Sequence, residues 1–249
     1  MTKVLLVGET WLTAETHYKG FDSFGSVTLA SGAGPLLDAL AGEDVEIEHL
    51  PAHDAPERFP LHTAGLEPYD VVLLSDIGAN SLLLHPDTWR LGQKRPNRLK
   101  LLADWVRAGG GLAMAGGYLS FQGFEAKAGY RRTAIEEVLP CTIDPWDDRV
   151  ETPEGFPPQR TVAAHPVVDG FDGKWPELLG YNRFTARDDA TVLAVHGDDP
   201  ILAVRQLERG RTLAWASDIG PHWCPAEFLA WDGYRRLWAQ SINWLAGRS

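Results

Sequence analysis

The chain has 249 residues, a formal net charge of −11 at pH 7, and a composition that is 44% apolar and 23% charged. These values are typical of one globular domain over residues 1–249, and no apolar run reaches the ~18 residues needed to span a bilayer. The negative charge argues against nucleic acid, because that partner is held mainly by Lys and Arg side chains. We therefore expect neither a nucleic-acid nor a membrane partner.

The amino-terminal segment MTKVLLVGE passes from one lysine directly into a short β-like run. It lacks the long apolar stretch and the small-residue cleavage site of a secretory signal, so we expect a cytoplasmic protein. The two cysteines, Cys141 and Cys224, lie far apart in sequence and have no CxxC spacing. This pattern predicts free thiols and neither a disulfide framework nor a zinc site.

Four short apolar runs predict strands that are covered on both faces, as in a parallel sheet. They are residues 4–7, 71–74, 112–115 and 213–216. Residues 45–50 alternate as a half-exposed strand would, and helical patterns occupy 35–41 and 97–108. This order indicates right-handed βαβ units in an α/β fold, with a doubly wound, mostly parallel flavodoxin-like sheet and helices on both faces.

The second half of the chain begins with a change of character near residues 139–160, where prolines and acids cluster without apolar periodicity. We interpret this stretch as a Pro-rich surface excursion. Beyond it, 191–195, 201–206 and 212–216 are typical of successive strands joined by turns. They predict an antiparallel carboxyl-terminal extension of the sheet, closed by an amphipathic helix at 234–245.

Polar residues follow each central strand, where a doubly wound sheet binds its ligands. They include Glu9, Thr10, Trp11, Ser75, Asp76, Gly78, Asn80, Gly116, Gly117, Tyr118, Ser120, Ser217, Asp218 and His222. Three acids at three strand ends can together bind a cation or a polyol, or act as general acid and base. Alternatively, each acid caps the helix or loop that follows it.

The sharpest local feature is a strand that runs into Gly116 and Gly117 and then a small polar residue, the form of a tight strand-to-helix elbow. It resembles the nucleophile elbow of class I glutamine amidotransferases, whose pattern is Gly-x-Cys-x-Gly. Tyr118 stands where that pattern has cysteine. Because a phenol with a pKa of about 10 does not replace a thiolate in forming a thioester, we expect no ordinary glutaminase activity.

The same resemblance implies a catalytic histidine followed by an acid after a late strand, which corresponds to His222 and Glu227. It also implies an oxyanion hole near Gly78. We therefore expect the backbone amides of Gly78 and Leu119 to donate hydrogen bonds to a developing negative charge.

Nearly the whole chain resembles an amidotransferase-like branch related to proteins of the trehalose-utilisation type. The matching motifs are GETW at 8–11, HYKGFD at 17–22, SDIGAN at 75–80, GGYLSF at 116–121, HPV at 165–167 and SDIGPHW at 217–223. The resemblance implies the fold throughout. It does not imply a particular reaction, because a fold does not determine activity.

Several residues keep two interpretations. Cys224 is either a relocated nucleophile beside His222 or a buried structural thiol, and its aromatic setting favours the structural role. Four histidines, His17, His85, His165 and His222, lack metal-ligand spacing, so we expect no cofactor, although a divalent metal is compatible with the acids. Residues 17–24 form either a lid or a subunit contact, and the 10 tryptophans favour a homo-oligomer.

Two functions follow from these observations. The first is a hydrolase- or transferase-like enzyme acting on a small polar metabolite such as a sugar derivative, with Tyr118, Asp218 and His222 as catalytic residues. Its expected ligand-binding residues are Glu9, Trp11, His17, Asp76, Gly78, Asn80, Gly117 and Ser120. The second is a catalytically silent binding or assembly protein that keeps the fold and the pocket.

Overall fold

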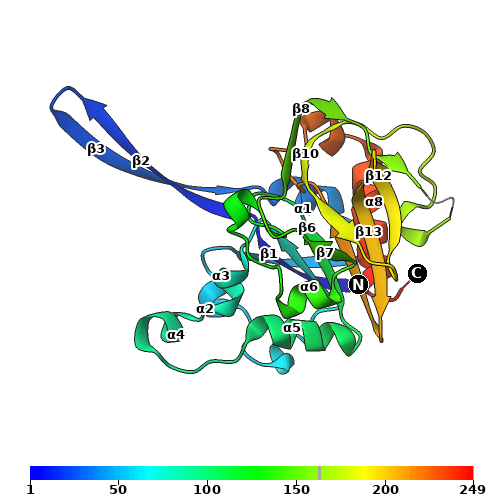
Figure 1. Ribbon diagram of the computed structural model, residues 1–249, viewed down its shortest axis with the longest axis horizontal. Helices are drawn as coiled ribbons and strands as arrows, with labels where there is room; N and C mark the ends of the chain where they lie inside the picture. Colours follow the sequence, from blue (N-terminus) through cyan, green and yellow to red (C-terminus); the bar gives the residue numbers. More distant parts are fainter. Residues whose placement is uncertain (162–163, 249) are drawn as a thin grey trace.

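The computed structural model describes residues 1–161 and 164–248, and its centre is an eight-stranded sheet (Figure 1). The strands are β1 (Thr2–Gly8), β4 (Val45–Pro51), β5 (Val71–Ser75), β6 (Gly111–Ala115), β9 (Gln159–Arg160), β12 (Thr191–His196), β13 (Asp199–Leu207) and β14 (Gly210–Trp215). Their order in the sheet is β4-β1-β5-β6-β14-β13-β12-β9. The first five strands are parallel, and the last three pair antiparallel with their neighbours. The antiparallel extension by β12 and β13 was predicted, whereas β9 was not.

The parallel part of the sheet has the strand order of flavodoxin-like folds, in which the first strand lies between the second and the third. Strands β5 and β6 are buried along their whole length, which explains why they appear in the sequence as continuous apolar runs. The order reverses between β1 and β5. A ligand crevice is therefore expected beyond the carboxyl ends of these two strands.

Helices cover both faces of the sheet. Helix α1 (Gly34–Leu40) packs against α8 (Asp232–Leu245), and α5 (Arg98–Arg107) packs against α3 (Ala79–Leu83) and α6 (Ala134–Val138). The Asn97 side chain caps α5 by accepting from the Lys100 amide, which explains its predicted start. Short helices α2 (Ala55–Arg58), α4 (Pro86–Leu91) and α7 (Ala226–Leu229) complete the set. Over residues 1–161 and 164–248, no helix has the length and hydropathy that a bilayer crossing requires.

The Pro-rich excursion has more structure than the sequence suggested. Strand β7 (Cys141–Ile143) pairs with β11 (Phe184–Ala186), β8 (Arg149–Phe156) pairs with β10 (Leu178–Asn182), and β9 joins the edge of the main sheet. Asp148 in this segment is buried. The interpretation as a surface excursion missed these strands. Their partner strands come much later in the chain, so the pairing produces no periodic pattern of apolar residues within residues 139–160.

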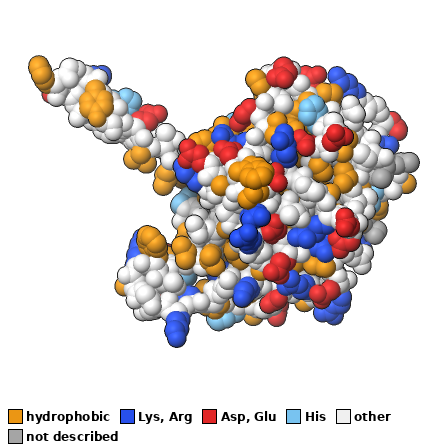
Figure 2. All heavy atoms as spheres, viewed as in Figure 1, with side chains coloured by type: hydrophobic (Ala, Val, Ile, Leu, Met, Phe, Trp, Pro, Cys, Tyr) orange, Lys and Arg blue, Asp and Glu red, His pale blue; other side chains and the backbone are white. Residues whose placement is uncertain are grey.

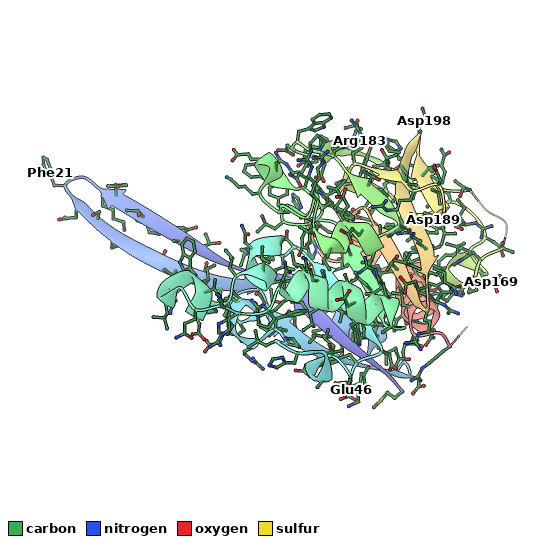
Figure 3. All side chains as sticks on the ribbon, turned by 60° about the horizontal axis from the view of Figure 1, so that its bottom comes forward. Phe21, Glu46, Asp169, Arg183, Asp189 and Asp198 are labelled. Carbon is green, nitrogen blue, oxygen red and sulfur yellow. The ribbon has the colours of Figure 1, made fainter. Side chains whose placement is uncertain are left out.

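A hairpin that the sequence did not predict leaves the body directly after β1 (Figure 1). It consists of β2 (Thr10–Lys19) and β3 (Asp22–Ser31), and we call residues 10–31 the arm. Phe21 lies at its tip and points away from the body (Figure 3). Residues 17–24 therefore form the outer end of the arm rather than a lid over the strand ends.

Candidate functional site

A cavity of about 460 Å³ opens at the carboxyl ends of β1, β5, β6 and β14, where the topology predicts a ligand. It is lined by Glu9, Trp11, Asp76, Tyr118, Leu119, Phe124, Asp218, Gly220, Pro221 and His222. Six of the residues predicted for catalysis or binding belong to this lining: Glu9, Trp11, Asp76, Tyr118, Asp218 and His222. Cavities beside β4 and beside α8 contain a single carboxylate each.

Asp218 and His222 form a hydrogen-bonded pair just after β14. Oδ2 of Asp218 lies 2.8 Å from Nδ1 of His222 and also accepts the Trp223 amide at 3.0 Å. Burial alone would lower the pKa of His222, but the bond to Asp218 and the charges of Asp218, Glu151 and Asp76 outweigh it, so the pKa is raised. With Nδ1 held by Asp218, Nε2 is the ring nitrogen that remains for a ligand.

Tyr118 lies at the elbow after β6. Gly117 has a φ of +133°, a conformation that favours glycine, and its amide donates to Oδ1 of Asn182 at 2.9 Å. The Tyr118 ring meets the His222 ring edge-on, with centroids 4.6 Å apart, and its hydroxyl donates to Oε1 of Glu151 at 3.3 Å. The elbow therefore presents a phenol to the same cavity as the Asp218–His222 pair.

Glu9 and Asp76 follow β1 and β5 with positive φ values of 53° and 43°, which are uncommon for residues other than glycine. Burial raises the pKa of Glu9 from 4.5 to about 8. The negative charges of Asp76 and Asp218 also raise this pKa, whereas the hydrogen bond from Ser75 lowers it. The Ser75 hydroxyl donates to Oε1 of Glu9 at 2.5 Å. Burial also raises the pKa of Asp76. At neutral pH Glu9 thus carries a proton and can donate a hydrogen bond.

The expected oxyanion hole is not formed as the resemblance implied. The Leu119 amide donates to Oδ1 of Asp76 at 2.7 Å, so a carboxylate already occupies it. Gly78 caps the start of α3, and Asn80 lies in that helix with an exposed side chain; neither lines the cavity. Ser120 is also outside the lining, but its hydroxyl oxygen accepts the Asp76 amide at 3.1 Å and so helps to place Asp76.

The structure places two other predicted residues outside the cavity. Glu227, the acid implied to follow the histidine, lies exposed in α7, and the acid that pairs with His222 is Asp218, which precedes it. His17 lies in the outer half of the arm, where Nε2 is 3.1 Å from the Ser26 hydroxyl and the ring stacks on Phe24 at 4.7 Å. His17 is therefore not part of this cavity.

Residues of β8 support the site and were missed. Glu151 accepts the Tyr118 hydroxyl and, at 2.9 Å, the Nε1–H of Trp223. The Arg149 guanidinium lies 4.7 Å from the Tyr118 ring centroid and 4.2 Å from that of Phe124. These contacts fix the phenol from behind. The acid cluster in the Pro-rich stretch was the only sequence signal for them.

A buried polar network holds the elbow from below. Oδ1 of Asp148 accepts from Nδ2 of Asn182 at 2.8 Å and from the Gly123 amide at 2.9 Å, while Oδ2 accepts the Gln122 amide at 2.7 Å. Burial raises the pKa of Asp148 to about 6 in spite of these bonds. Because Asn182 also accepts the Gly117 amide, this network fixes the backbone that presents Tyr118.

Neither cysteine has the environment of a nucleophile. Cys141 and Cys224 are both fully buried, and burial raises the pKa of each thiol far above its usual range. A reactive cysteine needs the opposite shift together with access to solvent. The structure therefore agrees with a structural thiol at Cys224.

The four histidines do not converge on a metal. His85 and His165 cap the starts of short helical segments by accepting the amides of Asp87 and Val167, while His222 pairs with Asp218. Within residues 1–161 and 164–248, no group of three or more His, Cys, Asp or Glu side chains is placed to hold a metal ion.

A protein-family comparison matches residues 3–247 to the family described as "Putative glutamine amidotransferase". The chain belongs to this class I amidotransferase-like family. The match confirms the resemblance seen in the sequence. No curated protein matches the chain.

Two solved structures are similar over their full length. Cytoplasmic protein STM3548 from Salmonella typhimurium is 42% identical, with 97% of this chain and 98% of that one covered and a TM-score of 0.93. Cytoplasmic protein STM1381 from Salmonella typhimurium LT2 is 40% identical, with 98% and 99% covered and a TM-score of 0.93. Their description as cytoplasmic agrees with the location expected from the sequence.

A ThuA-like protein from Parabacteroides merdae is more distant. It is 13% identical, with 98% of this chain and 90% of that one covered and a TM-score of 0.58. At this identity the likeness shows a shared fold alone. The sequence analysis predicted that this chain shares its fold with proteins of the trehalose-utilisation type.

The protonated Glu9 should make stability depend on pH. The unfolded chain releases this proton near pH 4.5 and the folded chain near pH 8, so the folded state binds more protons between these values. The free energy of unfolding should therefore fall across this window, by an amount on the order of a few kcal/mol. Urea unfolding of wild type and Glu9→Gln from pH 4.5 to 8.5 should show a steeper decline for wild type. An equal slope for the two proteins would contradict the shift, and Glu15→Gln, at an exposed position, is the matched control.

Proposed function

We propose that the chain binds and processes a small, uncharged, hydroxyl-rich metabolite such as a sugar derivative, without a thiol nucleophile. The observation that carries the proposal is the Asp218–His222 pair, which meets Tyr118 in a cavity that also holds two carboxyl groups with raised pKa values, Glu9 and Asp76. Perturbed carboxyl groups gathered in one cleft favour an active site over a set of capping residues.

The polar groups of the cavity suit hydroxyl groups in particular. A hydroxyl both donates and accepts. The wall offers donors in protonated Glu9 and in His222, and acceptors in Asp76 and in the oxygen of Tyr118, whose O–H donates to Glu151. Trp11 and other aromatic residues add flat apolar surface. A few convergent polar groups on an otherwise aromatic wall are the usual composition of a small-molecule site.

The charge of the cavity argues against acidic ligands. None of the described lining residues is Lys or Arg, and the nearby Arg149 is paired with Asp147 and packs behind Tyr118. The carboxylate of glutamine or of a sugar acid would therefore face like charges without a cationic partner. Neutral sugars and polyols avoid this cost.

The chemistry that fits is proton transfer at an oxygen atom. His222, oriented and kept more basic by Asp218, would take or give a proton through Nε2. Tyr118, whose O–H donates to Glu151, would accept a hydrogen bond from a ligand hydroxyl through its phenol oxygen. A hydrolase- or transferase-like reaction follows from these roles. A glutamyl thioester does not, because Tyr118 replaces the cysteine and the other thiols are buried.

A thermal-shift screen of neutral sugars, polyols, sugar acids, glutamine and divalent metals tests this proposal. We expect at least one neutral hydroxyl-rich compound to raise the melting temperature, because a ligand that binds only the folded state stabilises it. Tyr118→Phe should weaken that shift and Asp218→Ala should abolish it. Tyr69→Phe, which removes a phenol bonded to Glu48 in a different cavity, should retain it.

The second candidate function is a silent binding or assembly protein. The observation that favours it is the arm, whose exposed apolar side chains other than Trp11 lie outside the cavity lining. If no compound in the screen changes the melting temperature, the binding or assembly function is favoured over the metabolite-processing function.

A further inference from the structure

The two faces of the arm differ in charge. Cross-strand partners point to the same side of a hairpin, so the register divides the arm into two sets of residues. One set, which we call the uncharged face, consists of Thr10, Leu12, Ala14, Thr16, Tyr18, Ser23, Gly25, Val27, Leu29 and Ser31. The charged side chains of β2 and β3, Glu15, Lys19 and Asp22, all belong to the opposite face.

This alternation is the pattern of a sheet with one face covered and one in water. Among the residues that the structure describes, none covers the uncharged face: the exposed fractions are 61% for Leu12, 69% for Val27 and 58% for Leu29. Figure 2 shows the arm standing clear of the body, with hydrophobic side chains at several places along it. An isolated two-stranded hairpin is also only marginally stable in water. The arm therefore has the composition of a sheet with one buried face, although no other part of the described chain packs on that face.

We propose that the uncharged face of the arm docks on the body of a second copy of this chain, whose own arm docks back in a twofold exchange. The area favours this arrangement. A ribbon of two strands of ten residues measures roughly 33 Å by 10 Å, so one docked arm buries about 660 Å² counting both surfaces. Two arms bury about 1,300 Å², within the range of stable complexes, whereas a single arm on another protein stays below it.

The charge pattern of the arm permits contact with a second copy. Two molecules of net charge −11 repel one another over most of their surfaces. The uncharged face adds no like charge to the contact, and the opposite face keeps Glu15 and Asp22 in water. A basic partner would instead be recognised through acidic side chains, which this face does not have. This inference does not depend on the identity of the ligand.

Sedimentation velocity of the full chain over a range of concentrations tests the docking. Wild type should sediment as at least a dimer of the 27.4 kDa chain. The double variant Val27→Glu/Leu29→Glu, which puts charges on the uncharged face, should weaken association by about 100-fold or more. Both positions are exposed in the single chain, so we expect the circular dichroism spectrum to be unchanged.

The matched control is Thr28→Glu, which lies between these two residues and points to the opposite face. It adds a charge to the same strand and should leave the oligomer intact. Wild type that is monomeric at every concentration would overturn the proposal. So would a double variant that associates as well as wild type, or a control variant that dissociates as fully as the double variant.

Discussion

Replacing Asp218 with asparagine is expected to lower the pKa of His222 and to weaken ligand binding by about 10- to 100-fold. The substitution keeps the size of the side chain but removes the negative charge that offsets the burial of the imidazole. NMR titration of the His222 ring protons in wild type and Asp218→Asn measures the first effect. The melting-temperature shift produced by the ligand measures the second.

The sign of the stability effect follows from the same shift. A histidine whose pKa is raised in the folded state adds stability below its unfolded pKa of 6.5, and that stability is lost as the pH rises through the folded pKa. Asp218→Asn should lack this contribution at low pH. His165, whose pKa is lowered by burial and by Arg211, is an internal control that should not change. An unchanged pKa for His222 would contradict the role assigned to Asp218.

Gly117→Ala is expected to cause the largest loss of stability, about 2–4 kcal/mol in the free energy of unfolding. The φ of Gly117 is +133°, and a Cβ at this position would lie 2.9 Å from Oδ1 of both Asp76 and Asp218. The new methyl group must therefore displace two residues of the cavity. Urea unfolding measures the change in stability. The ligand-induced rise in melting temperature should also be lost in this variant.

Gly34→Ala is the matched control for this prediction. It is the same substitution at the start of α1, where an added Cβ meets no atom within 4 Å and φ is not positive. Its stability should lie within about 1 kcal/mol of wild type. If Gly117→Ala were as stable as this control, the close approach of the two carboxylates to the elbow would be wrong.

The central sheet was predictable from the sequence because its strands are buried on both faces. Residues 71–74 and 112–115 appear as continuous apolar runs for that reason, and the polar residues after them mark the strand ends. The same reasoning placed Asp76, Tyr118 and Asp218 near one another before the geometry was known. Strand ends of a parallel sheet meet at one edge whatever the loops between them do.

The arm and the residues behind Tyr118 could not be predicted in this way. The arm is exposed on both faces in one chain, and polar Thr and Ser residues are mixed with the apolar residues of its uncharged face, so β2 and β3 lack the continuous apolar runs that marked the central strands. Glu151 reaches the site through the pairing of β8 with β10, and Asp148 through its hydrogen bond from Asn182 in β10. The sequence of β10 lies beyond a stretch of unrelated loops. Such tertiary pairing overrides the local cues of proline and acid content.

The family resemblance also gave a wrong partner for one backbone amide, that of Leu119. The resemblance implied that the Leu119 amide faces a developing negative charge, but a resident carboxylate, Asp76, already accepts its hydrogen bond. A family pattern records which residue stands at a position. It does not record which neighbour has taken the hydrogen bond there.

The central claim is that this site, which has no accessible thiol nucleophile, does not hydrolyse glutamine, and ammonia release from glutamine tests it most directly. The assay compares wild type with the double variant Cys141→Ser/Cys224→Ser in the same buffer. We predict that neither protein releases ammonia above the rate of buffer alone. Release by wild type that the double variant loses would show a working thiol, and release that both share would show that Tyr118 or His222 hydrolyses glutamine; either result would contradict the claim.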